Sequence, residues 1–495
     1  MKSVLVNTSS SMQMIQNNLI FRNNNNNNKI MKKSAILLLI GATTMFSGCQ
    51  VGPDWTAPHM EVPAAFRGDS VGGGTMADTP WQSVIRDKHL IALLTDVFNN
   101  NHSLEAMQHN VDAARQYVTI ARAPIFPWLG YGASTSKGMN SQGGASVAQT
   151  GGVTSNPGSL AGSASWELDI WGKTSREVES AEASAQAAQE QLNYMRASLL
   201  RQVATGYLQL LMLDEQLRIT REAVASYRES LALFSDQLES GIADGLQVAS
   251  ARAALAAAEA EIPALEMQIA ELENTLSVLA GRMPGHIERS GSLQQYVSAS
   301  KVSAGIPADV ISRRPDIRKA EQNLRAANAD VGVAIASYFP SISLTGTAGY
   351  ASADLRRTTS GYAHTSGWGI GASLTGPLFQ AGQLRANELA KRDAFLAAKA
   401  DYEYAVLNAL AEISTTLIER EKLREVIIKQ EEAVAAYEES VKLAEQRYKE
   451  GLSAYFEVLD NQLRLFPAKK QLVQYRYQYA ACIPTLYTQL GGGWK

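Results

Sequence analysis

Two very long stretches without a helix breaker constrain the fold of this chain more than any other feature. No proline occurs from 158 to 262 or from 378 to 466, and alanine, glutamate, glutamine and leucine dominate there at helical spacing. A helix over about 175–240 would be roughly 100 Å long, at about 1.5 Å per residue. No globular core is that wide, so such helices must pack side by side in a coiled-coil-like array.

A glycine and then a proline follow each long stretch in the same order. Gly241 and Gly451 predict turns, after which a second helix runs back along the first. Pro263 and Pro467 lie in the returning segments and predict kinks there, because proline lacks the N–H that an inner helical turn uses. Each long segment therefore predicts a helical hairpin with a glycine at its tip.

The chain contains one unit twice. Residues 103–127 match 316–340 at an offset of 213, and residues 221–230 match 431–440 at an offset of 210. An ordered series of matches at nearly constant spacing indicates a duplication rather than chance.

Each copy is expected to begin with one helix. The pattern predicts this helix over about 84–123 in the first copy and 316–337 in the second. Pro315 suits the start of the second one, where a missing N–H costs nothing. Pro127 and Pro340 should end the two helices.

Alternating apolar and small polar residues then predict a β-hairpin in each copy, over 128–171 and 341–379, with Gly-, Ser-, Thr- and Asn-rich loops at 137–158 and 352–366. The strands are near the ~9–11 residues that cross a bilayer. Four strands cannot close a barrel, and an open sheet edge in lipid leaves unpaired backbone groups. If these strands lie in a membrane, the barrel must be shared between chains.

Composition and motifs exclude several classes of protein. The chain has 45 Lys and Arg against 48 Asp and Glu, which gives no sign of nucleic-acid binding, and no run of 18 apolar residues, which excludes a polytopic helical membrane protein. Gly172-Lys173-Thr174 ends like a phosphate loop, but Glu167 stands at the first glycine position. The six histidines are scattered. We therefore expect no enzyme, no cofactor and no metal site.

The N-terminal region predicts export and lipidation. A short basic segment and an apolar run precede Cys49, so residues 31–48 are expected to be a signal peptide whose last three residues form a lipobox-like Phe-Ser-Gly-Cys with Cys49. Cys49 is then the lipidated residue, and a plain signal peptide with an incidental cysteine is the alternative. Lipoproteins that stay in the inner membrane typically have Asp directly after the cysteine, whereas this chain has Gln50. The resemblance to lipoproteins therefore implies the outer membrane. The Asn-rich residues 1–30 indicate a misassigned start or a disordered extension.

Five segments of the sequence are distinctive: residues 51–66, residues 166–173, an Arg-Arg-Pro-Asp signature from Arg313, residues 376–382 and a glycine-rich tail ending at Trp494. They resemble the N-terminal strap, the first strand-to-helix corner, the signature, the second corner and the tail of the TolC-like outer membrane factors, in the NodT-type lipoprotein branch that serves resistance-nodulation-division efflux pumps.

This resemblance covers about 49–495 and implies a mostly α fold with a β-barrel portion. It implies a homotrimer that shares a 12-strand barrel in outer membrane lipid and a 12-helix periplasmic tunnel. It also implies a passive exit duct that engages a periplasmic adaptor (a membrane fusion protein) and a proton-driven inner-membrane transporter. The cargo is not implied.

The expected organisation of the mature chain has four parts. A lipidated strap occupies 49–83, the first repeat 84–284, an equatorial linker 285–315 and the second repeat 316–495.

A duct needs a gate, and the tips at Gly241 and Gly451 are also the expected adaptor contacts. Glu457 and Asp460 are three residues apart, so they share one helix face. In a trimer each would form a ring of three carboxylates, which raises their pKa by like-charge repulsion and attracts cations. The resemblance implies gate acids at these two positions, with Tyr448 as a hydrogen-bonding latch.

Three alternatives stay open. The two acids could simply form a solvated helix face, while the first copy offers only Asp244 and Gln247 at its tip. Some relatives carry Arg three residues after the acid matched to Asp460, but here Leu463 stands there and Arg464 follows. The sequence therefore does not predict a salt bridge between protomers at this position. For the whole chain, a type I protein-secretion duct and a structural periplasmic coiled-coil lipoprotein are the alternatives to a pump.

Overall fold

The computed structural model describes most of residues 50–494. The described residues are 50–67, 75–85, 87–140, 153–155, 158–241, 244–297, 307–352 and 365–494. Cys49, the predicted signal peptide and the predicted N-terminal extension lie outside them. The chain divides into two compact units. One unit contains the sheet, and the other contains most of the helical hairpins.

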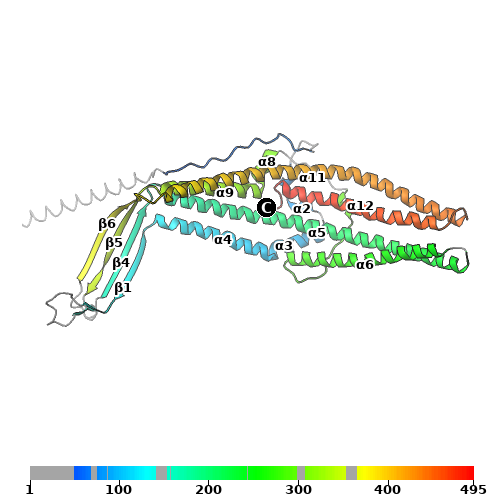
Figure 1. Ribbon diagram of the computed structural model, residues 1–495, viewed down its shortest axis with the longest axis horizontal. Coiled ribbons are helices and arrows are strands. Elements are labelled where there is room, and N and C mark those ends of the chain that lie inside the picture. The colour runs from blue at the N-terminus through cyan, green and yellow to red at the C-terminus, as the bar shows by residue number, and fades with distance from the viewer. Residues whose placement is uncertain are drawn as a thin grey trace, which may run out of the picture. The chain divides into compact units, whose positions relative to one another are not determined.

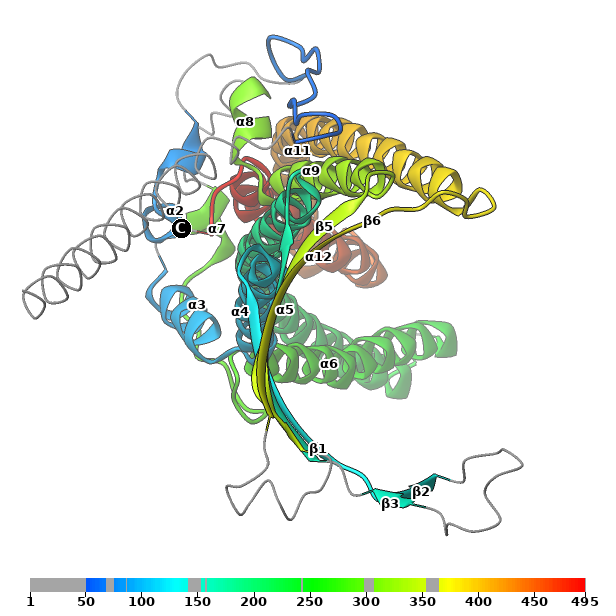
Figure 2. The same ribbon diagram turned by 90° about the vertical axis from the view of Figure 1, so that its left-hand side faces the viewer.

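The first unit is built on one four-stranded antiparallel sheet in the order β1-β4-β5-β6 (Figure 1). Its strands are β1 Trp128–Thr135, β4 Gly158–Leu168, β5 Ser341–Ser352 and β6 Thr365–Thr375. Figure 2 shows them edge-on as a curved layer. The central pair, β4 and β5, joins the two copies, so the two predicted hairpins form a single sheet.

One predicted loop contains further strands. β2 Gly138–Asn140 pairs with β3 Val153–Ser155, so the prediction of a loop throughout 137–158 is wrong for these residues. β2 follows β1 along the chain and β3 precedes β4, and the β1–β4 pairing already holds these segments antiparallel. The backbone N–H and C=O groups of β2 and β3 therefore pair with each other.

The two long helices match their prediction. α5 spans Lys173–Glu239 and α11 spans Gln383–Lys449, and each has 67 residues. Asp169 begins α5, because its carboxylate accepts hydrogen bonds from the backbone N–H groups of Thr174 at 2.9 Å and Ser175 at 2.7 Å.

Glycine forms both hairpin tips. The returning helices are α6 Gly245–Leu279 and α12 Phe456–Gln489. Gly241 and Gly451 both adopt a φ of 72°, and a Cβ added to either would meet nothing within 4 Å. The left-handed backbone, and not lack of space, therefore requires glycine at these turns.

The first helix of the first copy differs from its prediction. Instead of one helix over 84–123 there are α3 Lys88–Asn100 and α4 His102–Arg122. The Asn101 side chain accepts a hydrogen bond from Leu104 N at 2.8 Å, so it starts a new helix there.

The second copy begins its helix at Pro315, as predicted. The remaining elements are short or belong to that copy: η1 Met76–Asp78, α2 Trp81–Val84, η2 Ala123–Ile125, α7 Leu293–Val297, α8 Pro307–Arg313 and α9 Pro315–Ala336. α7 and α8 lie within the predicted linker. α6 and α12 continue through Pro263 and Pro467.

The core of the second unit follows the long helices. Leu200, Val203 and Tyr207 of α5 are fully buried at helical spacing, and α12 contributes Leu459 and other apolar residues to the same cluster. The helices therefore bury their apolar faces against one another along their length, as their size requires. Within the described ranges, no helix combines the length and apolarity needed to cross a membrane.

Candidate functional site at the helix tips

The predicted latch residue contacts the other copy. Tyr448 lies in the last turn of α11, and its hydroxyl accepts a 2.9 Å hydrogen bond from the side-chain amide of Gln237 near the end of α5. A polar contact thus ties the tip of the second hairpin to the tip of the first.

An aromatic contact reinforces this link. The ring of Tyr455, just before α12, lies 5.0 Å from that of Tyr448 and 5.4 Å from that of Phe234 on α5, both edge-on. Its hydroxyl lies 3.2 Å from Ser230 Oγ. We call Ser230, Phe234, Gln237, Tyr448 and Tyr455 the tip seam. Burial raises the pKa of Tyr455, so its hydroxyl stays protonated near neutral pH.

The predicted gate acids lie outside the tip seam. Asp460 pairs with Arg464 of the same helix at 3.0 Å, and Glu457 lies 3.9 Å from Arg447 of α11. All four side chains are about half exposed. Arg464, one position after the place where some relatives carry Arg, therefore pairs with Asp460 within its own helix. Each of the two acids thus has a cation beside it.

The two copies use their tips differently. In the first copy, Asp244 accepts a 3.0 Å hydrogen bond from Gln247 N and caps α6. In the second copy Tyr455 occupies the capping position and makes no side-chain cap hydrogen bond. The first-copy acid thus has a local structural role, while Tyr455 faces the neighbouring hairpin.

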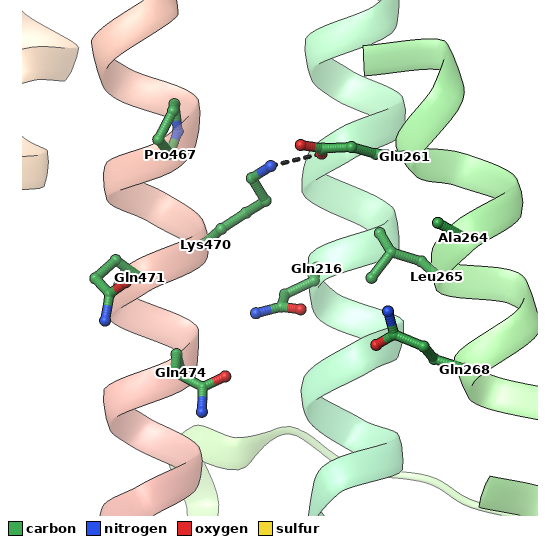
Figure 3. Close-up of a pocket in the computed structure, with 9 residues that line it drawn as sticks. All are labelled: Gln216, Glu261, Ala264, Leu265, Gln268, Pro467, Lys470, Gln471 and Gln474. Carbon is green, nitrogen blue, oxygen red and sulfur yellow. Dashed lines mark hydrogen bonds and ion pairs between the residues drawn. The ribbon is translucent and has the colours of Figure 1, made fainter. Parts of the chain in front are cut away.

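A groove runs beside α12 further from the tips (Figure 3). Lys470 of α12 reaches across it to Glu261 of α6 at 2.5 Å, and Gln216 of α5 points into it between them. Its volume is about 380 Å³, and Gln268, Gln471 and Gln474 also line it. The groove presents an ion pair and several amides beside the apolar side chains of Ala264, Leu265 and Pro467.

The strap is held at the first strand-to-helix corner. Arg176 is only 2% exposed; it pairs with Asp54 at 2.9 Å and Glu179 at 2.8 Å, and its Nε donates to the carbonyl of Val51. A Cβ on Gly52 would lie 2.6 Å from a backbone atom of the neighbouring helix α9, so only glycine permits this approach. The residues directly after Cys49 are therefore fixed beside the sheet.

The strand register separates two chemically distinct faces. One face carries mainly apolar side chains or glycine: Leu129, Tyr131, Ala133, Leu160, Gly162, Ala164, Trp166, Leu168, Ile342, Leu344, Gly346, Ala348, Tyr350, Trp368, Ile370, Ala372 and Leu374, with Thr135 and Ser366 as polar exceptions among the described side chains. The other face carries mainly Ser, Thr, Gly and Ala, with Trp128 and Glu167. We call the first one the apolar face. A sheet that meets lipid on one side and water on the other has this pattern.

Comparison with known proteins decides the family. The sequence profile described as "Outer membrane efflux protein" matches residues 93–282 and 306–492. The chain belongs to the outer membrane efflux protein family. This family consists of channel proteins, and its TolC-like structures combine a helical barrel with a β portion.

Characterised members of the outer membrane efflux protein family match nearly the whole chain. The antibiotic efflux pump outer membrane protein ArpC of Pseudomonas putida is 32% identical over 467 residues, covering 92% of this chain and 95% of ArpC. The cation efflux system protein CusC of Escherichia coli O6:H1 is 30% identical, with 91% and 96% covered. The open-state structure of the Neisseria gonorrhoeae MtrE channel matches with a TM-score of 0.80, 28% identity, and 90% and 99% covered. This chain is therefore an efflux channel of the outer membrane.

Proposed function

We propose that three copies of this chain form a passive exit duct for small molecules in a tripartite efflux pump. The separation of apolar and small polar residues on the two faces of the sheet carries this proposal. β1 and β6 are the edge strands, and each can pair with the next copy, so three copies supply twelve strands. A periplasmic adaptor and a proton-driven resistance-nodulation-division transporter complete the pump.

We assign the gate to Tyr448, Glu457 and Asp460 at the tips. The tip seam holds α12 and α11 against α5. Opening requires the hairpin of α11 and α12 to move away from α5, and the Tyr448–Gln237 hydrogen bond and the Tyr455–Phe234 ring contact must then break. Rings of Glu457 and Asp460 around a trimer axis would favour cations at the entrance.

The adaptor is proposed to bind in the same region, at the hairpin tips and the groove beside them. The glycine turns at Gly241 and Gly451 end the hairpins, and the groove beside Lys470 offers amide and charged groups to an incoming helix. The efflux names of the relatives favour a pump over a type I protein-secretion duct or a structural coiled-coil lipoprotein.

We further propose that Cys49 is lipidated after removal of the signal peptide 31–48, and that the strap, two repeats and linker have the predicted boundaries. The Arg176 contacts support the anchor, because they fix the residues beside Cys49 near the end of β4. Thiol titration of the unfolded, purified chain tests the lipid: one reactive thiol, that of Cys482, is expected, whereas two would contradict it.

Single-channel conductance in planar bilayers tests the gate. Tyr448→Phe removes the acceptor for Gln237, and Asp460→Ala breaks the pair with Arg464 and leaves a smaller side chain, so both should loosen the gate and raise the closed-state conductance. Glu425→Ala is the matched control, because Glu425 forms an exposed pair with Lys422 in one helix as Asp460 does with Arg464. Unchanged conductance in both gate variants would overturn the gate assignment.

A further inference from the structure

The apolar face contains a hollow at the middle of its strands. Two successive rungs cross all four strands there: Leu129–Ala164–Gly346–Ile370 and Tyr131–Gly162–Ala348–Trp368. In both rungs the outer residues are large and the two inner residues are glycine or alanine. We call the four inner residues, on β4 and β5, the Gly–Ala hollow.

Large side chains also limit the hollow along the strands. The next rung on one side places Leu160 opposite Tyr350, and the next rung on the other side places Trp166 opposite Leu344. The resulting depression has a volume of about 460 Å³ and is lined by residues of all four strands. It is therefore bounded on every side.

The packing of the chain does not require glycine in this hollow. A Cβ on Gly162 or Gly346 would meet its nearest neighbour at 3.8 Å, which is ordinary van der Waals contact. Gly349 on the opposite face differs, since a Cβ there would lie 2.4 Å from the carbonyl oxygen of Leu160. A larger side chain could fill the hollow without a clash, so its emptiness needs another explanation.

We propose that the Gly–Ala hollow binds a hydrocarbon chain of an outer membrane lipid. This inference rests on the proposed function, because it requires the apolar face to contact lipid. The side chains of the hollow on this face carry no charge, and hydrogen-bonding groups occur only on the aromatic residues around its rim, so a charged headgroup has no counterion here. A hydrocarbon chain has the matching chemistry.

The dimensions favour a lipid chain over a protein segment. Neighbouring strands lie about 4.8 Å apart, so β1 and β6 are separated by roughly 14 Å between backbones, and their large side chains narrow this space. An α-helix with side chains is about 10–12 Å wide and does not fit between them. A single acyl chain does.

Filling the hollow restores lost contacts. Paired strands cannot collapse to close a depression in their own surface, and an empty one leaves its walls without van der Waals partners. In lipid, close packing rather than the hydrophobic effect decides which groups associate. A chain lodged between Leu129 and Ile370 should therefore exchange more slowly than the lipid around it.

Photo-cross-linking tests the proposal on the full-length protein in nanodiscs of phosphatidylethanolamine that carries a diazirine in the middle of one acyl chain. We expect mass-spectrometric cross-links to concentrate severalfold on the peptides of the hollow relative to the rest of the apolar face. Ala348→Leu should lower them severalfold. Ala372→Leu is the matched control, because it adds the same side chain on the same face outside the hollow.

Each other outcome has a distinct meaning. Cross-links spread evenly over the apolar face, or insensitive to Ala348→Leu, would overturn the hollow but leave the membrane-spanning sheet intact. No cross-links to the face at all would contradict the proposed function itself. Cross-links that rise on the hollow only when Cys49→Ala prevents lipidation would show that the protein's own acyl chain occupies it, and would also overturn a membrane-lipid occupant. Conductance of Ala348→Leu confirms that this variant folds.

Discussion

A buried arginine binds the start of the strap to the rest of the first unit. Arg176 is 2% exposed, whereas its partner Asp54 is 89% exposed. Their interaction is therefore asymmetric: loss of the arginine removes a buried cation that also holds Glu179 and a strap carbonyl, while loss of the exposed carboxylate leaves the other contacts in place. The role of Arg176 could not be predicted from the sequence, because it belongs to no distinctive motif and its partners Asp54 and Val51 are distant along the chain.

Removal of this arginine should release the strap. We expect Arg176→Met to lower stability by about 3 kcal/mol, as for a broken buried pair, and Asp54→Asn by less than about 1 kcal/mol, as for an exposed one. Thermal unfolding gives the magnitudes, and hydrogen exchange at 50–54, which Arg176 contacts, reports release of this part of the strap. Equal effects of the two variants would show that burial of Arg176 does not matter.

At the scale of elements, local periodicity predicted the long helices and the strands well. α5 begins two residues before its predicted start and the second hairpin tip is at Gly451 as expected, because proline, glycine and apolar spacing act locally. The break at Asn101 does not follow from local periodicity, since the Asn101 side chain that makes it also donates to the carbonyl of Leu279 on another helix. The internal repeat does indicate this break, because Pro315, which starts α9, lies 213 residues after His102, which starts α4.

The glycine at the first tip can be tested against a neighbour. Gly241→Ala should destabilise the hairpin by about 1 kcal/mol, because its φ of 72° disfavours any Cβ. Gly245→Ala, in the first turn of α6 and also with open space around it, should instead be neutral or stabilise by up to about 1 kcal/mol. Thermal unfolding and hydrogen exchange of the α5 and α6 ends distinguish the two. A loss of stability in both variants would mean that the tip excludes side chains sterically.

At the scale of the whole molecule, the repeat predicted the architecture but not how the copies differ. At the repeat offset of 210, Tyr455 of the second copy aligns with Gly245 of the first, and Tyr448 aligns with Leu238. The tip seam therefore arises where the second copy departs from the first, and a comparison of the copies position by position is the signal that could have found it. Its partners on α5 could not be predicted, because which faces of two hairpins meet is a property of packing and not of local sequence.

The many buried phenols and the buried thiol should make the protein sensitive to alkali. Burial, and next the charge of Glu419, raises the pKa of Cys482 from 9.0 to about 12; burial, and next the charge of Glu261, raises that of Tyr227 from 10.0 to about 12. Burial also raises the pKa of a further set of tyrosines: Tyr207, Tyr296, Tyr402, Tyr455, Tyr477 and Tyr487.

These shifts predict the direction of the pH dependence. Above about pH 9 the unfolded chain loses protons that the folded chain keeps, so stability is fully present below pH 9 and falls as the pH rises toward 12, by up to ~1.4 kcal/mol per pH unit for each such group. Thermal unfolding at pH 8, 10 and 11 should show this decline, and Tyr227→Phe should make it shallower. Tyr404→Phe, at an exposed position, should leave the pH profile unchanged. A flat profile up to pH 11, or a Tyr227→Phe profile that parallels the parent, would show that these groups are ionised in the folded protein.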